Sequence, residues 1–213
     1  MTTILILAAG EQARWEIGQG VKQFLPIISE PLIVRTQRQV KDRGQSPLVV
    51  TCHQNIVKVS PAYYMILKKE ERRWTAETLK TTRWLWEPRV IVLLGDVVYS
   101  KALMDSIFEY GGPLRFWGTI HEIYAISFDS RRFTEMEQAL DKVIHHAEYE
   151  GGPGKLRKVY QALAGYSFDH NEIHHPYFEE VIHPDYTQDF DTVQEWHRFV
   201  REKLNQKVID DLP

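Results

Sequence analysis

Small residues and basic side chains near the start of the chain favour the binding of an anion. An apolar run at residues 4–7, typical of a buried strand, leads into two alanines and Gly10, where missing side chains expose backbone N–H groups. Arg14 and Lys22 follow and add positive charge. Together these residues suit a polyphosphate, whereas residues 8–10 alone fit equally an ordinary glycine turn after a buried strand.

Two carboxylates that are distant in the sequence each follow strand-like residues. Asp96 comes one glycine after the apolar run at residues 89–94, and Asp191 stands directly before a helix. Alternation along an extended strand puts Asp189 on the same side as Asp191. Carboxylate oxygens are the hard ligands that Mg²⁺ prefers. Two structural alternatives stay open: Asp96 caps a loop, and the late aspartates serve only the N-terminus of the following helix.

The order of these segments resembles the signature of the nucleotidyltransferases that activate sugar phosphates and related alcohol phosphates. The matching residues are Leu7-Ala8-Ala9-Gly10, Arg14, Lys22, Leu25-Pro26, Pro31-Leu32, Gly95-Asp96 and Asp189-Phe190-Asp191-Thr192. They are spread over nearly the whole chain. The chain departs from the family at two positions, because Gln12 and Trp74 stand where most members carry glycine.

The resemblance implies a Mg²⁺-dependent transfer of a nucleoside monophosphate from an NTP to a sugar phosphate or small alcohol phosphate, with release of pyrophosphate. It assigns catalytic roles to Arg14, which would neutralise the leaving pyrophosphate, and to Lys22, which would bridge the α-phosphate and the incoming phosphate. Asp96 and Asp191 would hold the Mg²⁺, with Asp189 as an auxiliary ligand. The residues expected to contact the nucleotide are Leu7, Ala8, Ala9, Gly10, Glu11, Thr75, Ala76 and Asp96.

The segments that must position these residues alternate between strand and helix. Strands are expected at residues 4–7, 47–51, 63–67 and 89–94, with helices at residues 31–44 and 75–86. This order argues for an α/β fold with a three-layer, Rossmann-like, mixed but mostly parallel sheet and helices on both faces, which the resemblance identifies with the nucleotide-diphospho-sugar transferase type. Such sheets bind ligands at the carboxyl ends of their strands, where Gly10 and Asp96 both fall.

The later part of the chain has a different pattern. Strands at residues 114–118 and 122–128 are expected to pair antiparallel, and helices are expected at residues 132–146, 155–164 and 193–204. Thr192 and Glu195 form a capping box for the last helix, which leaves Asp191 just outside it.

We expect a single domain over residues 1–213, with a nucleotide-binding half at 1–110, an acceptor-binding half at 111–190 and a C-terminal helix and tail at 191–213. The glycine-rich segment at residues 148–155 lacks the spacing of a phosphate loop. It is expected to form a flexible connection that presents Lys155 to the acceptor phosphate.

Composition and charge exclude several classes of function. The 26 basic and 29 acidic residues are spread along the chain and leave no footprint for nucleic acid, and the apolar runs are too short to cross a membrane. The single cysteine, Cys52, is expected to be a packed strand residue in a reducing compartment. The chain opens on strand-like sequence rather than a signal peptide, so we expect a cytoplasmic protein, with a homodimer as an open option.

Two other functions stay open. A glycosyltransferase of the same architecture would also bind a nucleotide and a metal, although it is expected to carry Asp-x-Asp at mid-chain, where this chain has only Asp96. A non-catalytic nucleotide-binding module is compatible with the departures at Gln12 and Trp74. A zinc site at His170 and His174 is not favoured, because neither a nearby cysteine nor a His-Glu-x-x-His pattern accompanies them.

Overall fold

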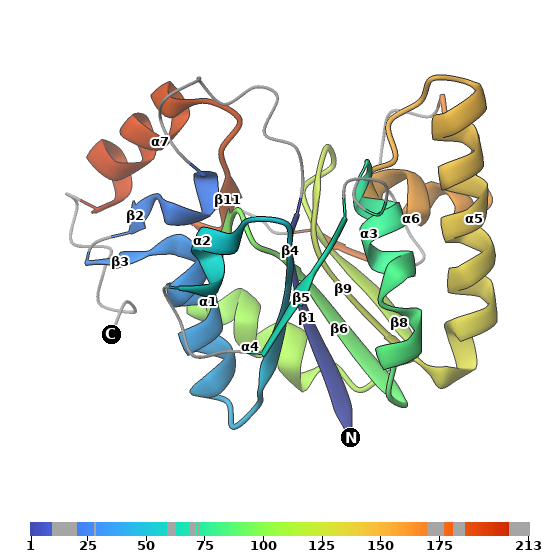
Figure 1. Ribbon diagram of the computed structural model, residues 1–213, viewed down its shortest axis with the longest axis horizontal. Coiled ribbons are helices and arrows are strands. Elements are labelled where there is room, and N and C mark those ends of the chain that lie inside the picture. Colours follow the sequence, from blue (N-terminus) through green and yellow to red (C-terminus); the bar gives the residue numbers. More distant parts are fainter. Residues whose placement is uncertain are drawn as a thin grey trace.

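A sheet of seven strands forms the centre of the protein, in the spatial order β10-β8-β9-β6-β1-β4-β5 (Figure 1). The computed structural model describes residues 1–9, 21–27, 29–58, 63–68, 71, 73–169, 177–180 and 186–204. The strands of the sheet are β1 (Thr2–Ala8), β4 (Pro47–Thr51), β5 (Tyr63–Ile66), β6 (Arg89–Leu94), β8 (Leu114–Gly118), β9 (Ile123–Asp129) and β10 (Phe178–Glu180).

The sheet is mixed but mostly parallel. β1 runs parallel to its neighbours β4 and β6, and β4 pairs with β5 and β8 with β10 in the same sense. β9 runs antiparallel to both β6 and β8. The predicted fold class and the predicted antiparallel pair are therefore confirmed. Because β9 is reversed, its first residues lie at the edge where the parallel strands end.

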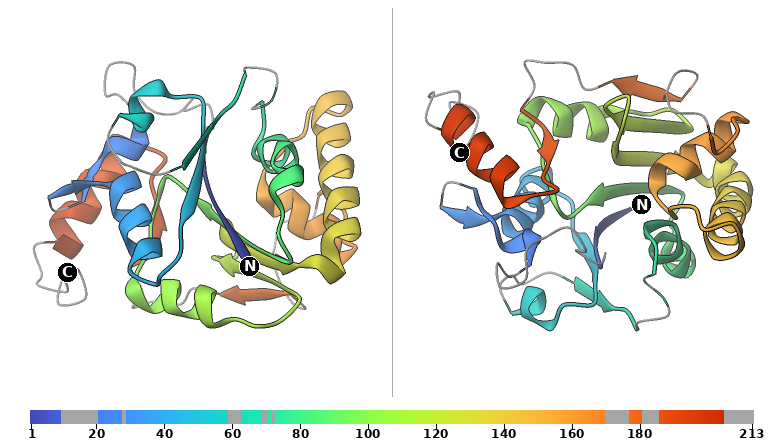
Figure 2. Two further views of the ribbon diagram at one scale, coloured as in Figure 1. Left: turned by 60° about the horizontal axis from the view of Figure 1, so that its bottom comes forward. Right: turned by 90° about the horizontal axis from the view of Figure 1, so that it is seen from above.

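Helices cover both faces of the sheet, as the two views of Figure 2 show. α1 and α4 pack on one face, and α3, α5 and α6 pack on the other. None of the helices formed by the described residues is long and apolar enough to cross a membrane. The helices are α1 (Leu32–Lys41), α2 (Gln54–Val57), α3 (Thr75–Thr81), α4 (Lys101–Glu109), α5 (Phe133–Tyr149), α6 (Leu156–Ala164) and α7 (Val193–Phe199).

The side chains of β1 alternate between the two layers. Ile4 and Ile6 are buried in the cluster with α1 and α4, whereas Leu5 and Leu7 are buried in the cluster with α3, α5 and α6. A strand that is covered on both faces needs apolar side chains at successive positions. This explains the continuous apolar run that opens the sequence.

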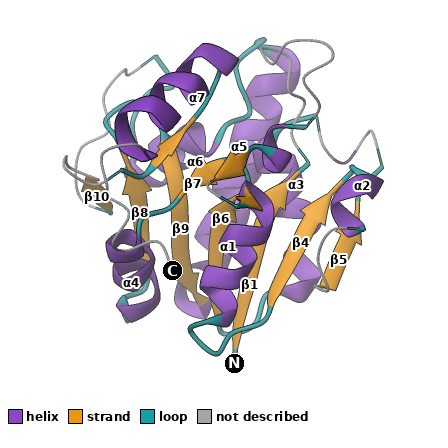
Figure 3. Cartoon of the chain, turned by 90° about the vertical axis from the view of Figure 1, so that its left-hand side faces the viewer, coloured by secondary structure: helices purple, strands orange, loops and turns teal. Residues whose placement is uncertain are grey.

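A third hydrophobic cluster brings together segments that are remote in the sequence. It lies around two small antiparallel ladders, β2 (Pro26–Ile27) with β3 (Glu30–Pro31) and β7 (Val97–Val98) with β11 (Gln188–Asp189), and around α7. Figures 1 and 3 show α7 at the end of the molecule opposite the N-terminus, where the central strands finish. The buried members of this third cluster are Leu25, Ile27, Leu32, Val98, Phe190, Val193 and Phe199.

The helix predicted to reach Trp86 ends earlier, at Thr81, and a 3-10 turn follows at Arg83–Leu85. The cause is Thr82, whose hydroxyl donates to the carbonyl oxygen of Leu79 at 2.7 Å and accepts from the Trp86 indole N–H at 3.1 Å. Side-chain bonds of this kind compete with the backbone bonds that would continue a helix. The Trp86 ring is thereby turned into the core instead of extending the helical face.

The third cluster can be tested at Phe190, which is fully buried and lies edge-on to Phe199 with ring centroids 5.1 Å apart. We expect Phe190→Ala to lower the free energy of unfolding by about 3–5 kcal/mol, because the cavity cannot collapse completely. Trp84→Ala is the control, since the Trp84 side chain is 75% exposed and its loss should change stability by less than about 0.5 kcal/mol. Urea unfolding measures both; similar values for the two variants would contradict the burial of Phe190.

Candidate active site

The ammonium group of Lys22 lies between two carboxylates at the carboxyl edge of the sheet. Its Nζ is 3.8 Å from Oδ2 of Asp96 and 3.8 Å from Oδ1 of Asp191. The Lys22 side chain is only 9% exposed, while the two aspartate side chains are about one third exposed, at 32% and 33%. Three of the five side chains predicted for catalysis and metal binding thus meet at one place, although they are far apart in the sequence.

Asp96 is held by a close contact between the ends of β1 and β6. The Gly95 N–H donates to the carbonyl oxygen of Leu7 at 2.8 Å. A Cβ atom on Gly95 would lie 2.9 Å from the Cβ of Ala8, which is closer than real Cβ atoms come. Glycine is therefore needed at this position for the strands to approach, and Asp96 follows it directly at the edge of the sheet.

Asp191 is held by the start of α7. The predicted capping box is confirmed, because the Thr192 hydroxyl accepts from the Glu195 N–H and the Glu195 carboxylate accepts from the Thr192 N–H. The Asp191 N–H also donates to Oε2 of Glu195 at 2.7 Å. On either side, Phe190 is buried in the third cluster and Asp189 pairs with Val97 in the β7–β11 ladder. The backbone of Asp191 is therefore fixed from both directions.

Lys22 begins a 3-10 turn, η1 (Lys22–Phe24), rather than lying in an exposed loop. Leu25 follows the turn and is buried in the third cluster, and its carbonyl oxygen accepts from the Leu32 N–H at the start of α1 at 2.9 Å. The third cluster therefore positions Lys22 as well as Asp191.

Negative charge exceeds positive charge in this part of the site. Burial raises the pKa of the Asp96 carboxyl, and the charges of Asp191 and Glu122 act in the same direction against the opposing Lys22 ammonium. Burial, together with the same neighbouring carboxylates and Asp96, raises the pKa of Asp189 to about 6. A further cation at this edge of the sheet would relieve the repulsion among these groups.

The donor chemistry of this cluster fits Mg²⁺. Two carboxylates already balance the positive charge of the Lys22 ammonium at this place. Mg²⁺ is commonly held in the same way, by one or two carboxylates together with substrate phosphates. Within the described part of the chain, no group of three or more His, Cys, Asp and Glu side chains is arranged to hold a metal ion by itself. The role of Asp189 as an auxiliary ligand stays a prediction.

Only the beginning of the predicted phosphate loop is described. Leu7 and Ala8 end β1, Ala9 follows, and all three are buried. The other predicted loop contacts, Gly10, Glu11 and Arg14, lie outside the described residues. The direction of β1 nevertheless leads the chain to the carboxyl edge at which Lys22, Asp96 and Asp191 gather.

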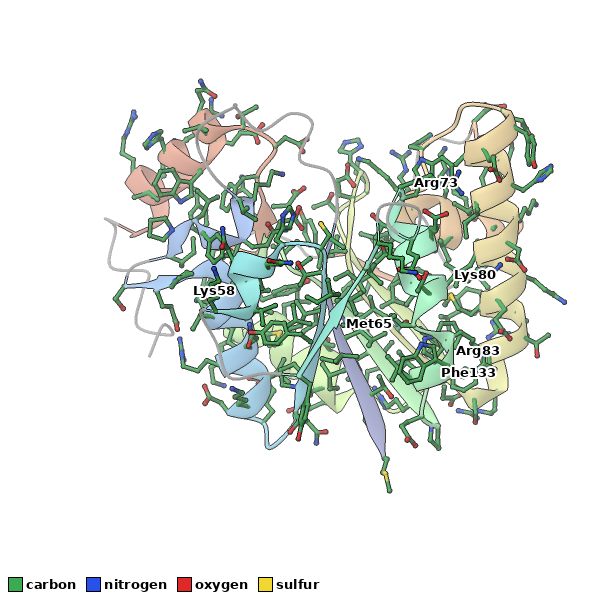
Figure 4. The ribbon with its side chains drawn as sticks, viewed as in Figure 1. Lys58, Met65, Arg73, Lys80, Arg83 and Phe133 are labelled. Atoms are coloured by element: carbon green, nitrogen blue, oxygen red, sulfur yellow. The ribbon has the colours of Figure 1, made fainter. Side chains whose placement is uncertain are left out.

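The predicted nucleotide contacts Thr75 and Ala76 lie at the start of α3, where Trp74 is packed against the glycine-rich connection. A Cβ on Gly154 would lie 2.3 Å from the Cβ of Trp74, and the Ala76 N–H donates to the Gly154 carbonyl oxygen at 2.9 Å. The Arg73 guanidinium lies over the Trp74 ring, 4.6 Å from the ring centroid. Figure 4 labels Arg73 near the start of α3. The nucleotide-binding role of Thr75 and Ala76 stays a prediction.

The connection at residues 151–155 is packed more closely than its composition predicts. Besides the contact of Gly154 with Trp74, a Cβ on Gly152 would lie 2.3 Å from the His146 ring. The expected flexible loop is therefore fixed to the ends of α3 and α5 through its glycines. Close packing explains the glycines at positions 152 and 154, whereas Gly151 has open space around it and a positive φ of 75°.

Lys155 precedes α6 and forms an ion pair with Glu122, with Nζ 3.0 Å from Oε1. The sequence analysis did not single out Glu122. Its charge raises the pKa of both Asp96 and Asp189, so it lies near enough to act electrostatically on the carboxylate cluster. Its place in the turn before β9 could have indicated this, because an antiparallel strand must begin where its parallel neighbours end.

Comparison with solved structures identifies the fold. The CTP:phosphocholine cytidylyltransferase from Streptococcus pneumoniae is similar over 94% of this chain and 98% of its own, with a TM-score of 0.66 and 13% identity. A protein assigned as a glucose-1-phosphate thymidylyltransferase from Bacillus anthracis matches over 93% and 94%, with a TM-score of 0.66 and 13% identity. The inositol-1-phosphate CTP transferase from T. maritima matches over 99% and 97%, with a TM-score of 0.61 and 10% identity.

The chain therefore has the fold of the nucleotidyltransferases that act on sugar and alcohol phosphates, as the sequence resemblance implies. These likenesses extend over nearly the full length of each chain. No family model matches the sequence, and no curated protein matches it. At identities of this size, the likeness is one of structure.

The contact between the ends of β1 and β6 can be tested at Gly95. We expect Gly95→Ala to lower the free energy of unfolding by about 1–3 kcal/mol, because the added Cβ meets Ala8 at 2.9 Å and a backbone oxygen at 3.1 Å. Gly111→Ala is the matched control, since nothing lies within 4 Å of a Cβ there. Urea titration of both variants measures the difference, and equal stabilities would contradict the close approach.

Proposed function

We propose that this chain is a Mg²⁺-dependent nucleotidyltransferase that transfers a nucleoside monophosphate from an NTP to a phosphorylated sugar or small alcohol and releases pyrophosphate. The fold of nucleotidyltransferases supports the reaction class. The observation that carries the proposal is the meeting of Lys22 with Asp96 and Asp191, at 3.8 Å from each. The single cysteine of the chain supports a reducing compartment, the cytoplasm, as the place of the reaction.

The reaction joins two anions, so its main requirement is positive charge at the phosphates. Asp96 and Asp191 would hold Mg²⁺, which when bound lowers the repulsion between the triphosphate and the acceptor phosphate. An oxygen of the acceptor phosphate forms a bond to the α-phosphorus while the bond from that phosphorus to the bridging oxygen of pyrophosphate breaks. The attacking oxygen is already ionised, so positioning and charge are sufficient without a protein base.

Lys22 supplies positive charge at this edge of the sheet. Its side chain is nearly buried, so little water competes for the ammonium group. When phosphates enter, the ammonium can exchange a carboxylate partner for a phosphate oxygen without leaving the edge of the sheet. Arg14 would act in the same way on the leaving pyrophosphate.

Lys155 is proposed to contact the phosphate of the acceptor. Its partner Glu122 is 37% exposed and Lys155 itself is 45% exposed, and ion pairs of this exposure contribute little to stability. The pair can therefore open for a phosphate at small cost. Opening it would also remove one positive charge from Glu122 and place it on the substrate.

The proposal is tested by measuring pyrophosphate release with CTP, UTP, GTP, dTTP and ATP against glucose 1-phosphate, phosphocholine and inositol 1-phosphate, in Mg²⁺ and in EDTA. We expect at least one combination to react in Mg²⁺ only, and Asp96→Asn to abolish it. Binding of an NTP without turnover in any combination would favour the non-catalytic module. Transfer from a nucleotide sugar without pyrophosphate release would favour the glycosyltransferase.

The role of Lys22 predicts a specific variant. Lys22→Met keeps most of the aliphatic stem but removes the charge between the two carboxylates, so we expect turnover to fall about a hundredfold or more while unfolding stays cooperative. Lys80→Met is the matched control, because Lys80 pairs with Asp141 on the exposed surface of α3. Pyrophosphate release measures the turnover, and thermal unfolding measures the stability. A loss of turnover in Lys22→Met that is explained by unfolding of the protein would contradict a catalytic role.

A further inference from the structure

Tyr99 is a fully buried tyrosine whose hydroxyl lies at the base of the turn that carries Asp96. It accepts a hydrogen bond from the Leu94 N–H at 2.8 Å and donates to the Tyr124 carbonyl oxygen at 2.6 Å, with the Leu94 carbonyl oxygen 3.2 Å away. Leu94 is the last residue of β6, and Tyr124 belongs to β9. One hydroxyl therefore joins two neighbouring strands where the turn to Asp96 begins.

The backbone of Tyr99 is held from the opposite side by α1. Its carbonyl oxygen accepts from Nη1 of Arg35 at 2.8 Å and from Nε2 of Gln39 at 3.1 Å, and both side chains are buried. The first N–H of α1, at Leu32, in turn donates to the Leu25 carbonyl oxygen behind Lys22. Tyr99 thus stands between the turn that carries Asp96 and the helix that anchors the Lys22 segment.

We infer that Tyr99 is a positioning residue for the active site, which sets the place of Asp96 relative to Lys22 through its hydroxyl and its carbonyl oxygen. The inference rests on the proposed function for its catalytic consequence. The hydrogen bonds themselves do not depend on that function. Tyr99 acts only through Asp96 and does not touch a substrate.

The hydroxyl, rather than the ring, is the part that matters for positioning. Phenylalanine at this position would keep the packing of the ring in the cluster with α1 and α4. It would leave the Leu94 N–H without its hydrogen bond to the tyrosine hydroxyl, and an unsatisfied buried donor costs free energy. Burial holds the pKa of the Tyr99 hydroxyl well above its usual range, so the group remains a neutral donor. The Leu94 to Asp96 turn should therefore loosen while the fold persists.

The test compares Tyr99→Phe with Tyr110→Phe in the full chain. Tyr110 also donates through its hydroxyl to a backbone oxygen, that of Leu114 at 2.9 Å, but it lies away from Asp96. We expect Tyr99→Phe to unfold cooperatively and to exchange the amide hydrogens of residues 94–97 about tenfold faster than wild type. Tyr110→Phe should leave the exchange of residues 94–97 unchanged.

Catalysis supplies a further measurement once a reacting substrate pair is known. Tyr99→Phe should lower kcat about tenfold and leave the KM for the NTP within about threefold. The triphosphate is proposed to bind the loop after β1, whereas the substitution alters the turn after β6. If wild type reacts with no substrate pair, the proposed function fails while the exchange measurement still decides the role of Tyr99.

Three outcomes would overturn the inference. The first is wild-type exchange of residues 94–97 in Tyr99→Phe, and the second is an equal change in Tyr110→Phe. The third is loss of cooperative unfolding in Tyr99→Phe, because the hydroxyl would then hold the fold as a whole rather than the turn at Asp96.

Discussion

The ammonium of Lys22 between the carboxylates of Asp96 and Asp191 is the interaction on which the site depends. Two carboxylates that lie close together in a partly buried place repel each other, and the positive charge between them offsets this repulsion. None of the three groups is near another in the sequence. Their meeting requires the third hydrophobic cluster, in which Leu25 and Phe190 lie close to Lys22 and Asp191 along the chain.

The mixed sheet explains why chemistry gathers at one edge. The residues that follow parallel strands lie at the same edge of the sheet. β1 and β6 are parallel, so the start of the phosphate loop and Asp96 lie at this edge. The reversed strand β9 adds the turn before it, and with it Glu122, to the same edge. The β7–β11 ladder then brings the C-terminal part of the chain back over this edge with Asp191. Each functional group thus arrives by a different connection.

Most of the sheet could be predicted because the signals are local, whereas the pairing of Asp96 with Asp191 is predicted from the resemblance to a family. Apolar runs mark the strands, the bounds of β4 agree with the prediction, and the Thr192 capping box is visible as a pattern. The β7–β11 ladder has strands of only two residues and depends on a distant partner, so no periodicity announces it. Tyr99 lies in an irregular segment, and its importance comes from hydrogen bonds to remote residues, which a single sequence does not display.

The contact between Trp74 and Gly154 has a consequence for how relatives of this chain diverge. A Cβ at position 154 would lie 2.3 Å from the Cβ of Trp74, so a side chain at position 154 requires that position 74 carry none. A homologue that carries glycine at position 74 has space for a side chain at position 154, whereas one that keeps the tryptophan does not. A side chain at position 154 is therefore expected only in homologues that carry glycine at position 74.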